Sequence, residues 1–166
     1  SNARLVGARM AGAELGGVNF SGANLSGANL SSARLTLTRL SGANLTGANL
    51  YKVDLRKTML DGVTLRGAKL AGAKLNQVDL SGRDLSGANL AGAKLLQANL
   101  SGADLSETSL VEANLTAVVL TDTVLVGADM RGSLLDGANL SRNDLTGAQL
   151  GGAHGSESKG RGERGE

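Results

Sequence analysis

Apolar residues recur every five positions along almost the whole chain. Every position divisible by five from Leu5 to Leu150 is Leu, Met or Phe, and Leu is by far the most common of the three. Two residues before each apolar position lies a small residue, usually Ala, and a polar residue, often Asn or Asp, lies between the two. The stretch 21–30, SGANLSGANL, contains this pentapeptide twice.

A period of five residues fits neither a continuous helix nor a continuous strand. In a helix, five residues advance about 140°, so the apolar side chains would wind around every face. In a strand, successive apolar side chains would point to opposite faces. All of them point inward only if each pentapeptide contains a short extended piece and a turn. In Ala23-Asn24-Leu25, Ala and Leu then point inward and Asn points outward, and Gly27 supplies the positive φ of a type II turn.

Departures from the pentapeptide recur every twenty residues. The Gly of the turn is replaced at five positions with this spacing: Leu37, Lys57, Gln77, Gln97 and Ala117. The small inward position is β-branched at the same spacing: Val18, Thr38, Thr58, Val78 and Val118. We therefore expect four pentapeptides in each coil, with one corner formed by a wider turn that is not type II.

The sequence predicts an all-β solenoid, a right-handed parallel β-helix of about 7.5 coils that is roughly 36 Å long. The sequence divides into three segments. Residues 1–3 have the composition of a cloning remnant, residues 4–150 form the repeat, and residues 151–166 are a Gly-rich, charged tail that reads as flexible.

The pentapeptides SGANL, TGANL and SGADL resemble the pentapeptide repeat family, whose consensus is A(D/N)LXX. The resemblance covers residues 3–150 and implies a right-handed quadrilateral β-helix. Some members of that family mimic duplex DNA and protect DNA gyrase from quinolone-type inhibitors. Those members look like acidic rods that carry protruding loops and dimerise through a C-terminal helix. In this chain, by contrast, the repeat has no insertion and its first half is basic.

Charge is uneven along the chain, although the net charge is only +2. Residues 4–75 hold ten basic and three acidic residues, for +7, and residues 76–150 hold four basic and nine acidic residues, for −5. Such runs are usually solvated faces. The alternative is electrostatic steering of a partner, or attraction between copies of the chain.

One group of side chains in the basic half is a candidate contact surface for a protein partner: Arg39, Tyr51, Lys52, Arg56 and Lys57. Tyr51 is the only tyrosine, and we expect it to point outward. The last four of these residues are expected on one corner of the coil, with Arg39 one coil away. The alternative is a solvated corner with an incidental aromatic residue.

A second candidate surface is apolar and belongs to the later coils. The outward positions there become apolar at Val111, Val119, Val124, Val126 and Leu134. Exposed apolar clusters often mark association surfaces, so we expect homodimer contacts either here or through an exposed end of the rod. The alternative is sequence drift with partial cover by the tail.

Two residues occupy small inward positions although they are polar, namely Arg83 and Asn143. Because a buried, unpaired Arg would be very costly, the Arg83 head group is expected to extend to solvent.

The composition argues against catalysis and against a bound cofactor. Cys is absent and His154 is the only His, so no thiolate site and no metal site are expected. No apolar run has the length of a membrane span. One Tyr and one Phe offer little base stacking, which disfavours nucleic acid as a partner. The sequence favours a non-catalytic scaffold that binds a protein, in the cytoplasm by default, and the alternative is a DNA mimic that binds gyrase.

Overall fold

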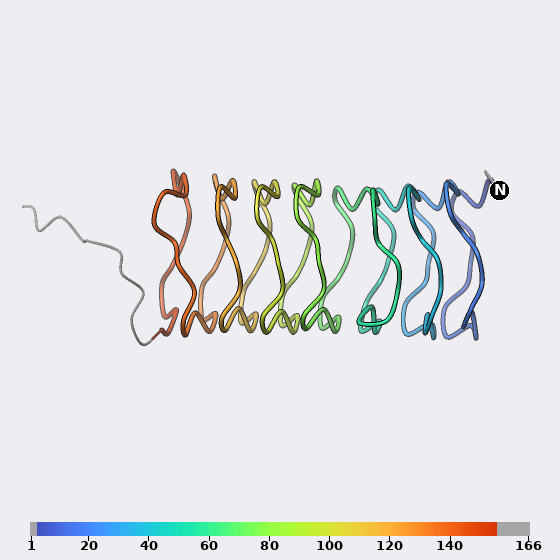
Figure 1. Cartoon of the computed structure of the whole chain (residues 1–166), viewed down its shortest axis with the longest axis horizontal. Helices are drawn as coiled ribbons and strands as arrows, with labels where there is room; N and C mark the ends of the chain where they lie inside the picture. The colour runs from blue at the N-terminus through green and yellow to red at the C-terminus, as the bar shows by residue number, and fades with distance from the viewer. Residues whose placement is uncertain (1–2, 156–166) are drawn as a thin grey trace, which may run out of the picture.

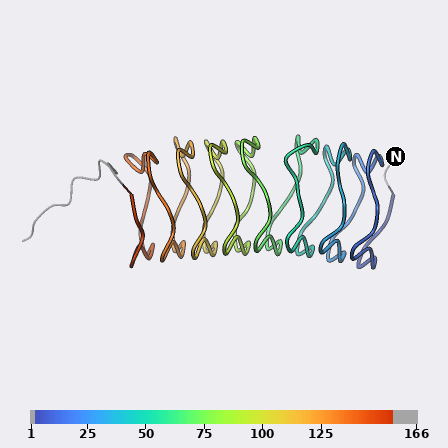
Figure 2. The same cartoon turned by 90° about the horizontal axis from the view of Figure 1, so that it is seen from below.

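The computed structural model describes residues 3–155, which form a rod of stacked coils (Figure 1). The chain advances from one end of the rod to the other without reversing, and the perpendicular view shows the same progression (Figure 2). Residues 3–155 contain no helix, and therefore none with the length and apolarity that crossing a membrane would require. The fold is the expected right-handed quadrilateral β-helix.

Nearly every pentapeptide contributes one bridging residue, and most of these residues pair in parallel with the residue twenty positions later. Asn24 pairs with Asn44, for example, and Asn29 pairs with Asn49. The hydrogen bonds of such a pair run in both directions along the rod: Leu25 N donates to Asn44 O at 2.8 Å, and Asn44 N donates to Ala23 O at 2.9 Å. The period of twenty that the sequence predicts is therefore the period of the backbone ladder.

The coil has four sides, which we name faces A to D in chain order by their outward residues. Face A carries Arg4, Asn24, Asn44, Thr64, Asp84, Asp104, Val124 and Asp144. Face B carries Arg9, Asn29, Asn49, Lys69, Asn89, Ser109, Asp129 and Gln149. Face C carries Glu14, Arg34, Asp54, Lys74, Lys94, Asn114, Leu134 and His154. Face D carries Asn19, Arg39, Met59, Asp79, Asn99, Val119 and Asn139.

The turns between faces have nearly uniform geometry. In a typical turn, Ala28 N donates to Leu25 O at 3.0 Å, and Gly27 has a φ of 64°. Within residues 3–155, the second turn residue has a positive φ in every pentapeptide except the one that contains Lys57.

The prediction of a wider turn at one corner is wrong for four of its five positions. Leu37, Gln77, Gln97 and Ala117 have φ values of 61°, 60°, 56° and 53°, close to those of the glycines at the other corners. The reason is the ladder, because the amide of the second turn residue must reach the next coil, as in the 2.9 Å bond from Gln77 N to Leu96 O. A non-Gly residue adopts the left-handed conformation to keep that bond.

The core is a continuous stack of Leu side chains, lined by the small inward residues. Leucines such as Leu25, Leu75 and Leu125 are fully buried, whereas Leu5 and Leu145, near the two ends, are only partly buried.

Several polar inward residues donate hydrogen bonds to the backbone of the preceding coil. Thr108 Oγ1 donates to Leu85 O at 3.0 Å, and Asn143 Nδ2 donates to Leu120 O at 2.6 Å. Arg83 is partly exposed, and its Nη1 atom lies beside Gly62 at the corner between faces D and A.

The ladder continues one pentapeptide beyond the boundary predicted at Leu150. Gly152 has the φ of the other turns, and His154 pairs with Leu134 on face C. These contacts are made by the backbone, so they do not need a Leu at position 155. The predicted cloning remnant at residues 1–2 and the tail from residue 156 lie outside the described residues.

Candidate protein-interaction surface

The predicted basic contact residues lie on two successive corners, not on one. Tyr51 and Lys52 form the turn between faces B and C, and Arg56 and Lys57 form the turn between faces C and D. Asp54 lies between the two turns on face C. A turn follows every five residues, so positions 52 and 57 are separated by a whole side of the coil.

Asp54 binds one of the predicted basic residues. Arg56 donates from Nε to Asp54 Oδ1 at 2.9 Å and from Nη2 to Oδ2 at 2.6 Å, and Lys74 Nζ lies 3.8 Å from Oδ2. The hydrogen bond from the Arg56 side chain is the largest influence on Asp54, and it holds the pKa of that carboxyl below its usual range. Arg56 is thereby largely neutralised.

The other three cations of this group, Arg39, Lys52 and Lys57, make no ion pair within residues 3–155, and they carry most of its net charge. Lys52 Nζ lies 5.0 Å from the centre of the Tyr51 ring, a favourable cation–π geometry, and Lys57 makes no ion pair with a described residue.

The turn at Lys57 differs from the others and interrupts the ladder. Leu37 N donates to Lys57 O at 3.0 Å, whereas the equivalent amide in the preceding coil, Gly17 N, donates to Thr36 O. The bond is thus shifted by one residue at this corner. A shallow depression is lined here by Thr36, Asp54, Arg56 and Lys57, and a second one next to it also includes Leu96.

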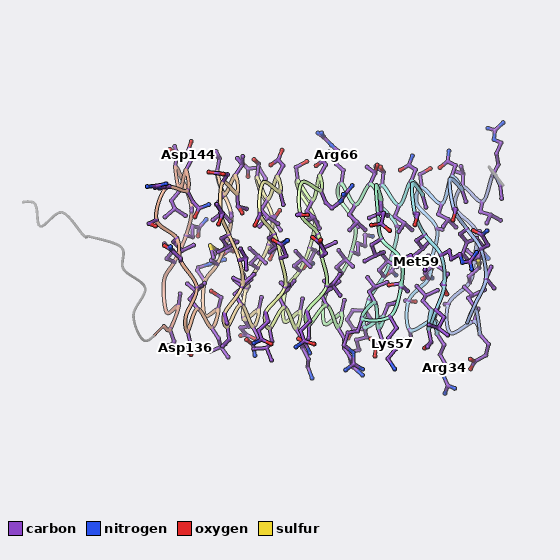
Figure 3. The ribbon with its side chains drawn as sticks, in the orientation of Figure 1. Arg34, Lys57, Met59, Arg66, Asp136 and Asp144 are labelled. Atoms are coloured by element: carbon purple, nitrogen blue, oxygen red, sulfur yellow. The ribbon has the colours of Figure 1, made fainter. Side chains whose placement is uncertain are left out.

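Two exposed apolar side chains that the sequence analysis did not single out lie beside these cations. Leu37, on the corner between faces C and D, is 67% exposed, and Met59, on face D, is 53% exposed. Met59 pairs through its backbone with Arg39, the remaining predicted contact residue. Lys57 and Met59 are both labelled in Figure 3. The signal was present in the sequence, because Leu37 replaces a turn Gly and Met59 replaces a polar outward residue.

We call this group the basic–apolar surface: Leu37, Arg39, Arg56, Lys57 and Met59. It follows the corner between faces C and D onto face D. Tyr51 and Lys52 lie across face C from it and are not part of it.

The predicted apolar patch of the later coils is dispersed around the rod. Val119 lies on face D, Val124 on face A and Leu134 on face C, and all three are exposed. Val111 and Val126 lie at two further corners and are only partly exposed. The period of twenty separates these residues, so they do not form one continuous surface.

Charge is separated across the rod as well as along it. Face C and its two flanking corners carry the central basic residues: Arg34, Lys52, Arg56, Lys57, Lys74 and Lys94. Face A and the corner before it carry four of the nine acidic residues of the later coils, Asp84, Asp104, Asp122 and Asp144, together with Asp61 from an earlier coil. In Figure 3, Arg34 and Lys57 project from one edge of the rod and Asp144 lies at the opposite edge.

The acidic side is stabilised in its charged form. Thr146 donates to Asp144 Oδ1 from its hydroxyl at 2.6 Å and from its amide at 2.9 Å, and these bonds hold the pKa of Asp144 below its ordinary value. The pKa of Asp104 is lowered mainly by hydrogen bonds from Ser106. No group of three or more His, Cys, Asp or Glu residues within residues 3–155 is arranged to hold a metal ion.

The sequence pattern of the family described as pentapeptide repeats matches the chain in eight copies, over residues 3–42, 43–82, 84–122 and 123–154. No individual curated protein sequence matches the chain.

Several solved structures resemble the rod. HetL, a pentapeptide repeat protein involved in heterocyst differentiation regulation from the cyanobacterium Nostoc, is 26% identical, with 90% of this chain and 85% of HetL covered and a TM-score of 0.37. A pentapeptide repeat protein from the Arabidopsis thaliana thylakoid lumen is 27% identical, with coverages of 72% and 66% and a TM-score of 0.39. QnrB1, a plasmid-mediated fluoroquinolone resistance protein, is 18% identical, with coverages of 93% and 87% and a TM-score of 0.52, a likeness of fold alone.

Proposed function

This chain belongs to the pentapeptide repeat family, and from that premise we propose that it is a non-catalytic scaffold that binds a protein partner. The observation that carries the proposal is the basic–apolar surface, where Leu37 and Met59 are exposed beside Arg39 and Lys57. Large apolar side chains next to cations suit a partner segment that combines an apolar anchor with carboxylates.

The size of the two apolar side chains is adequate for an anchor. Burying a large apolar side chain completely contributes about 1.5–3 kcal/mol, and Leu37 and Met59 still expose more than half of their surface. Together they would contribute about 2–3 kcal/mol to binding. The cations add mainly to the association rate and to specificity, because rim charges act chiefly on encounter.

The arrangement of polar groups supports binding over catalysis. Asp54, which borders the surface, is held by Arg56 and lies in a shallow depression. A buried, water-excluded site with a base poised for proton transfer is the usual requirement for acid–base catalysis. The described residues of this surface offer neither.

The proposal is tested by affinity capture of binding proteins from a lysate, with three forms of the protein side by side. The first is the wild type, and the second carries three charge reversals within the basic–apolar surface, Arg39→Glu, Arg56→Glu and Lys57→Glu. The third is a matched control with three charge reversals elsewhere, Arg9→Glu, Arg66→Glu and Lys69→Glu, on face B and the corner before it.

We expect a protein that is retained by the wild type and by the control and is lost with the second form. Replacing Leu37 with Gly and Met59 with Asn should weaken its capture as well. Equal capture by all forms would contradict the assignment of the site to this surface.

A second candidate function is protection of DNA gyrase by mimicry of duplex DNA. One observation favours it, the row of carboxylates at Asp84, Asp104 and Asp144 on face A. QnrB1, which shares the fold, is described as a fluoroquinolone resistance protein. A supercoiling assay with a fluoroquinolone separates the two candidates: the scaffold proposal expects no change in inhibition, and protection that is lost in the Asp84→Lys variant would favour mimicry instead.

A further inference from the structure

We propose that copies of this chain associate side by side and antiparallel, with face C of one copy against face A of the next. This inference goes beyond the proposed function. It rests on the charges of two opposite faces, and it needs neither the basic–apolar surface nor any other protein.

The two faces carry charges at the same spacing. On both faces, residues twenty apart pair along a parallel ladder, with one interruption on each, between Arg34 and Asp54 on face C and between Thr64 and Asp84 on face A. Within each continuous stretch, neighbouring outward side chains are about 4.8 Å apart. Because the spacing is shared, a match at one level is repeated at the next. The contact is then defined by two further features: the direction of the second rod relative to the first, and the register in which the two rows of residues face each other.

The order of charges on the two faces differs. From the N-terminal end, face C carries Glu14, Arg34, Asp54, Lys74 and Lys94, followed by Asn114, Leu134 and His154. Face A begins with Arg4, continues with three uncharged residues, and then reads Asp84, Asp104, Val124 and Asp144.

One antiparallel register places a carboxylate opposite every cation of face C. It places Arg34 opposite Asp144, Lys74 opposite Asp104 and Lys94 opposite Asp84. The carboxylate that interrupts face C, Asp54, falls opposite the one uncharged residue of the acidic row, Val124. Glu14 lies beyond the last described level of face A, so the two facing rows place no like charges opposite each other.

Other registers of the two faces place fewer residues of opposite charge opposite each other. No parallel register opposes more than two pairs of opposite sign, and every other antiparallel register opposes at most one. The favoured register also aligns the rods over nearly their full length, since it places Leu134 opposite Asn44 and His154 opposite Asn24. At one edge of the contact Lys52 then lies near Asp122, and Glu112 lies near Asp61. These two edge contacts have opposite signs and offset each other, so the rows on the two faces decide the register.

The charged side chains involved are all at least partly exposed, including Lys74, whose Nζ lies 3.8 Å from Asp54 Oδ2. The Arg34 and Glu14 side chains are 77% and 71% exposed although they lie 3.3 Å apart, and exposed pairs of this kind contribute little to stability. Lys94 makes no ion pair within residues 3–155. Both Thr146 bonds to Asp144 end on Oδ1, which leaves Oδ2 for an incoming guanidinium.

The contact joins two different faces on opposite sides of the rod, so it does not close on itself. Each copy still offers a free face C or face A after the first contact, and a heterologous contact of this kind produces an open array. Faces B and D stay uncovered in such an array.

Sedimentation velocity of the wild type and of two charge reversals, Lys94→Glu and Asp84→Lys, tests the proposal. Lys occupies equivalent outward positions at Lys69 and Lys74, so the ladder tolerates it. At about 0.01 M salt we expect the wild type to form species larger than a monomer that grow with concentration and dissociate at about 0.5 M salt. Each variant alone should associate about tenfold more weakly, and an equimolar mixture of the two should regain association, because Lys meets Asp or Glu meets Lys at every contact between unlike copies.

Cross-linking tests the direction. The chain has no Cys, so single cysteines can be placed at will. Thr64→Cys and Asn114→Cys, in separate copies, lie opposite each other in the antiparallel register. Facing sheets lie about 10 Å apart, too far for a direct disulfide, so a short bismaleimide should cross-link this pair. Asn24→Cys with Asn114→Cys is the matched pair that should not be cross-linked.

A wild type that stays monomeric at low salt overturns the proposal. So does association that neither charge reversal weakens, or a mixture that behaves like the separate variants. Loss of partner capture in the experiment on the basic–apolar surface has no bearing on these outcomes, which use a single purified protein.

Discussion

At the residue scale, the ladder outweighs the conformational preference of individual side chains. Among residues 3–155, ten residues other than Gly have a positive φ, and each occupies the second position of a turn. For an L-residue this conformation costs about 1–2 kcal/mol. Leu37 and Gln77 accept that cost because the amide of the turn residue must donate to the neighbouring coil, at 3.0 and 2.9 Å respectively.

We therefore expect Leu37→Gly to stabilise the protein and Gly42→Leu to destabilise it. Leu37 is largely exposed, so its removal forfeits little packing, and the relief of strain less the added chain entropy leaves a gain of up to about 1 kcal/mol. Gly42 has the same conformation at a φ of 67°, and Leu there should cost about 1–2 kcal/mol. Urea denaturation midpoints of both variants check this. A destabilised Leu37→Gly variant would mean that the Leu37 side chain packs against the rod.

At the element scale, the pentapeptide is the unit of stability. Each unit places one large and one small side chain in the core, closes one turn, and is bonded to the units twenty residues before and after it. A unit in the middle of the rod therefore has a coil on both sides. The leucines of the terminal coils remain partly exposed because they have a coil on one side only. Stability should depend on position along the rod, as in other repeat proteins.

Leu75→Ala and Leu150→Ala form a matched pair for this dependence. Leu75 is fully buried between coils, so its truncation should reduce the free energy of unfolding by about 2–5 kcal/mol. Leu150 is 37% exposed, and its truncation should cost clearly less. Chemical denaturation monitored by circular dichroism provides the comparison. Equal losses would contradict a stability that depends on neighbouring coils.

At the scale of the whole molecule, the period of twenty residues per coil decides which side chains share a face. Asp84 and Asp104 are neighbours on face A because they are twenty residues apart, and Arg34, Lys74 and Lys94 share face C for the same reason. Removing or adding one pentapeptide would move all later residues by one side of the coil. The leucines would stay inside, because every pentapeptide places the same kind of residue in the core. The outward charges would be redistributed.

Deletion of one neutral pentapeptide, residues 86–90, should therefore separate fold from assembly. The rod should still fold and unfold cooperatively, because the residues after the deletion move by one side of the coil and keep their leucines inward. Asp104 and Asp144 then move from face A to the side of face D, and Lys94 leaves face C, so the proposed self-association should be lost.

Deletion of a whole coil, residues 11–30, is the control for this experiment, since it keeps the phase and all the paired charges. Sedimentation velocity and circular dichroism of both deletions decide the outcome. Association that survives the deletion of residues 86–90 would show that face C and face A are not its basis.

The sequence by itself determined the coil. The repeat of five fixes which residues are buried, and the exceptions spaced by twenty fix four sides, because both follow from the geometry of extended backbone and turns. The sequence also identified the basic residues of the candidate surface. The basic first half and the acidic second half were also evident from the sequence, because that separation depends only on positions along the chain.

The tertiary structure decided which of these residues meet. It placed Lys52 and Lys57 on different corners, dispersed Val119, Val124 and Leu134 over three faces, and brought Met59 beside Arg39. It also showed that Leu37 keeps the turn that its side chain disfavours. The physical reason is common to all of these findings: neighbours on this rod are set by backbone hydrogen bonds between coils, and those bonds join residues that are distant in the sequence whatever their side chains prefer.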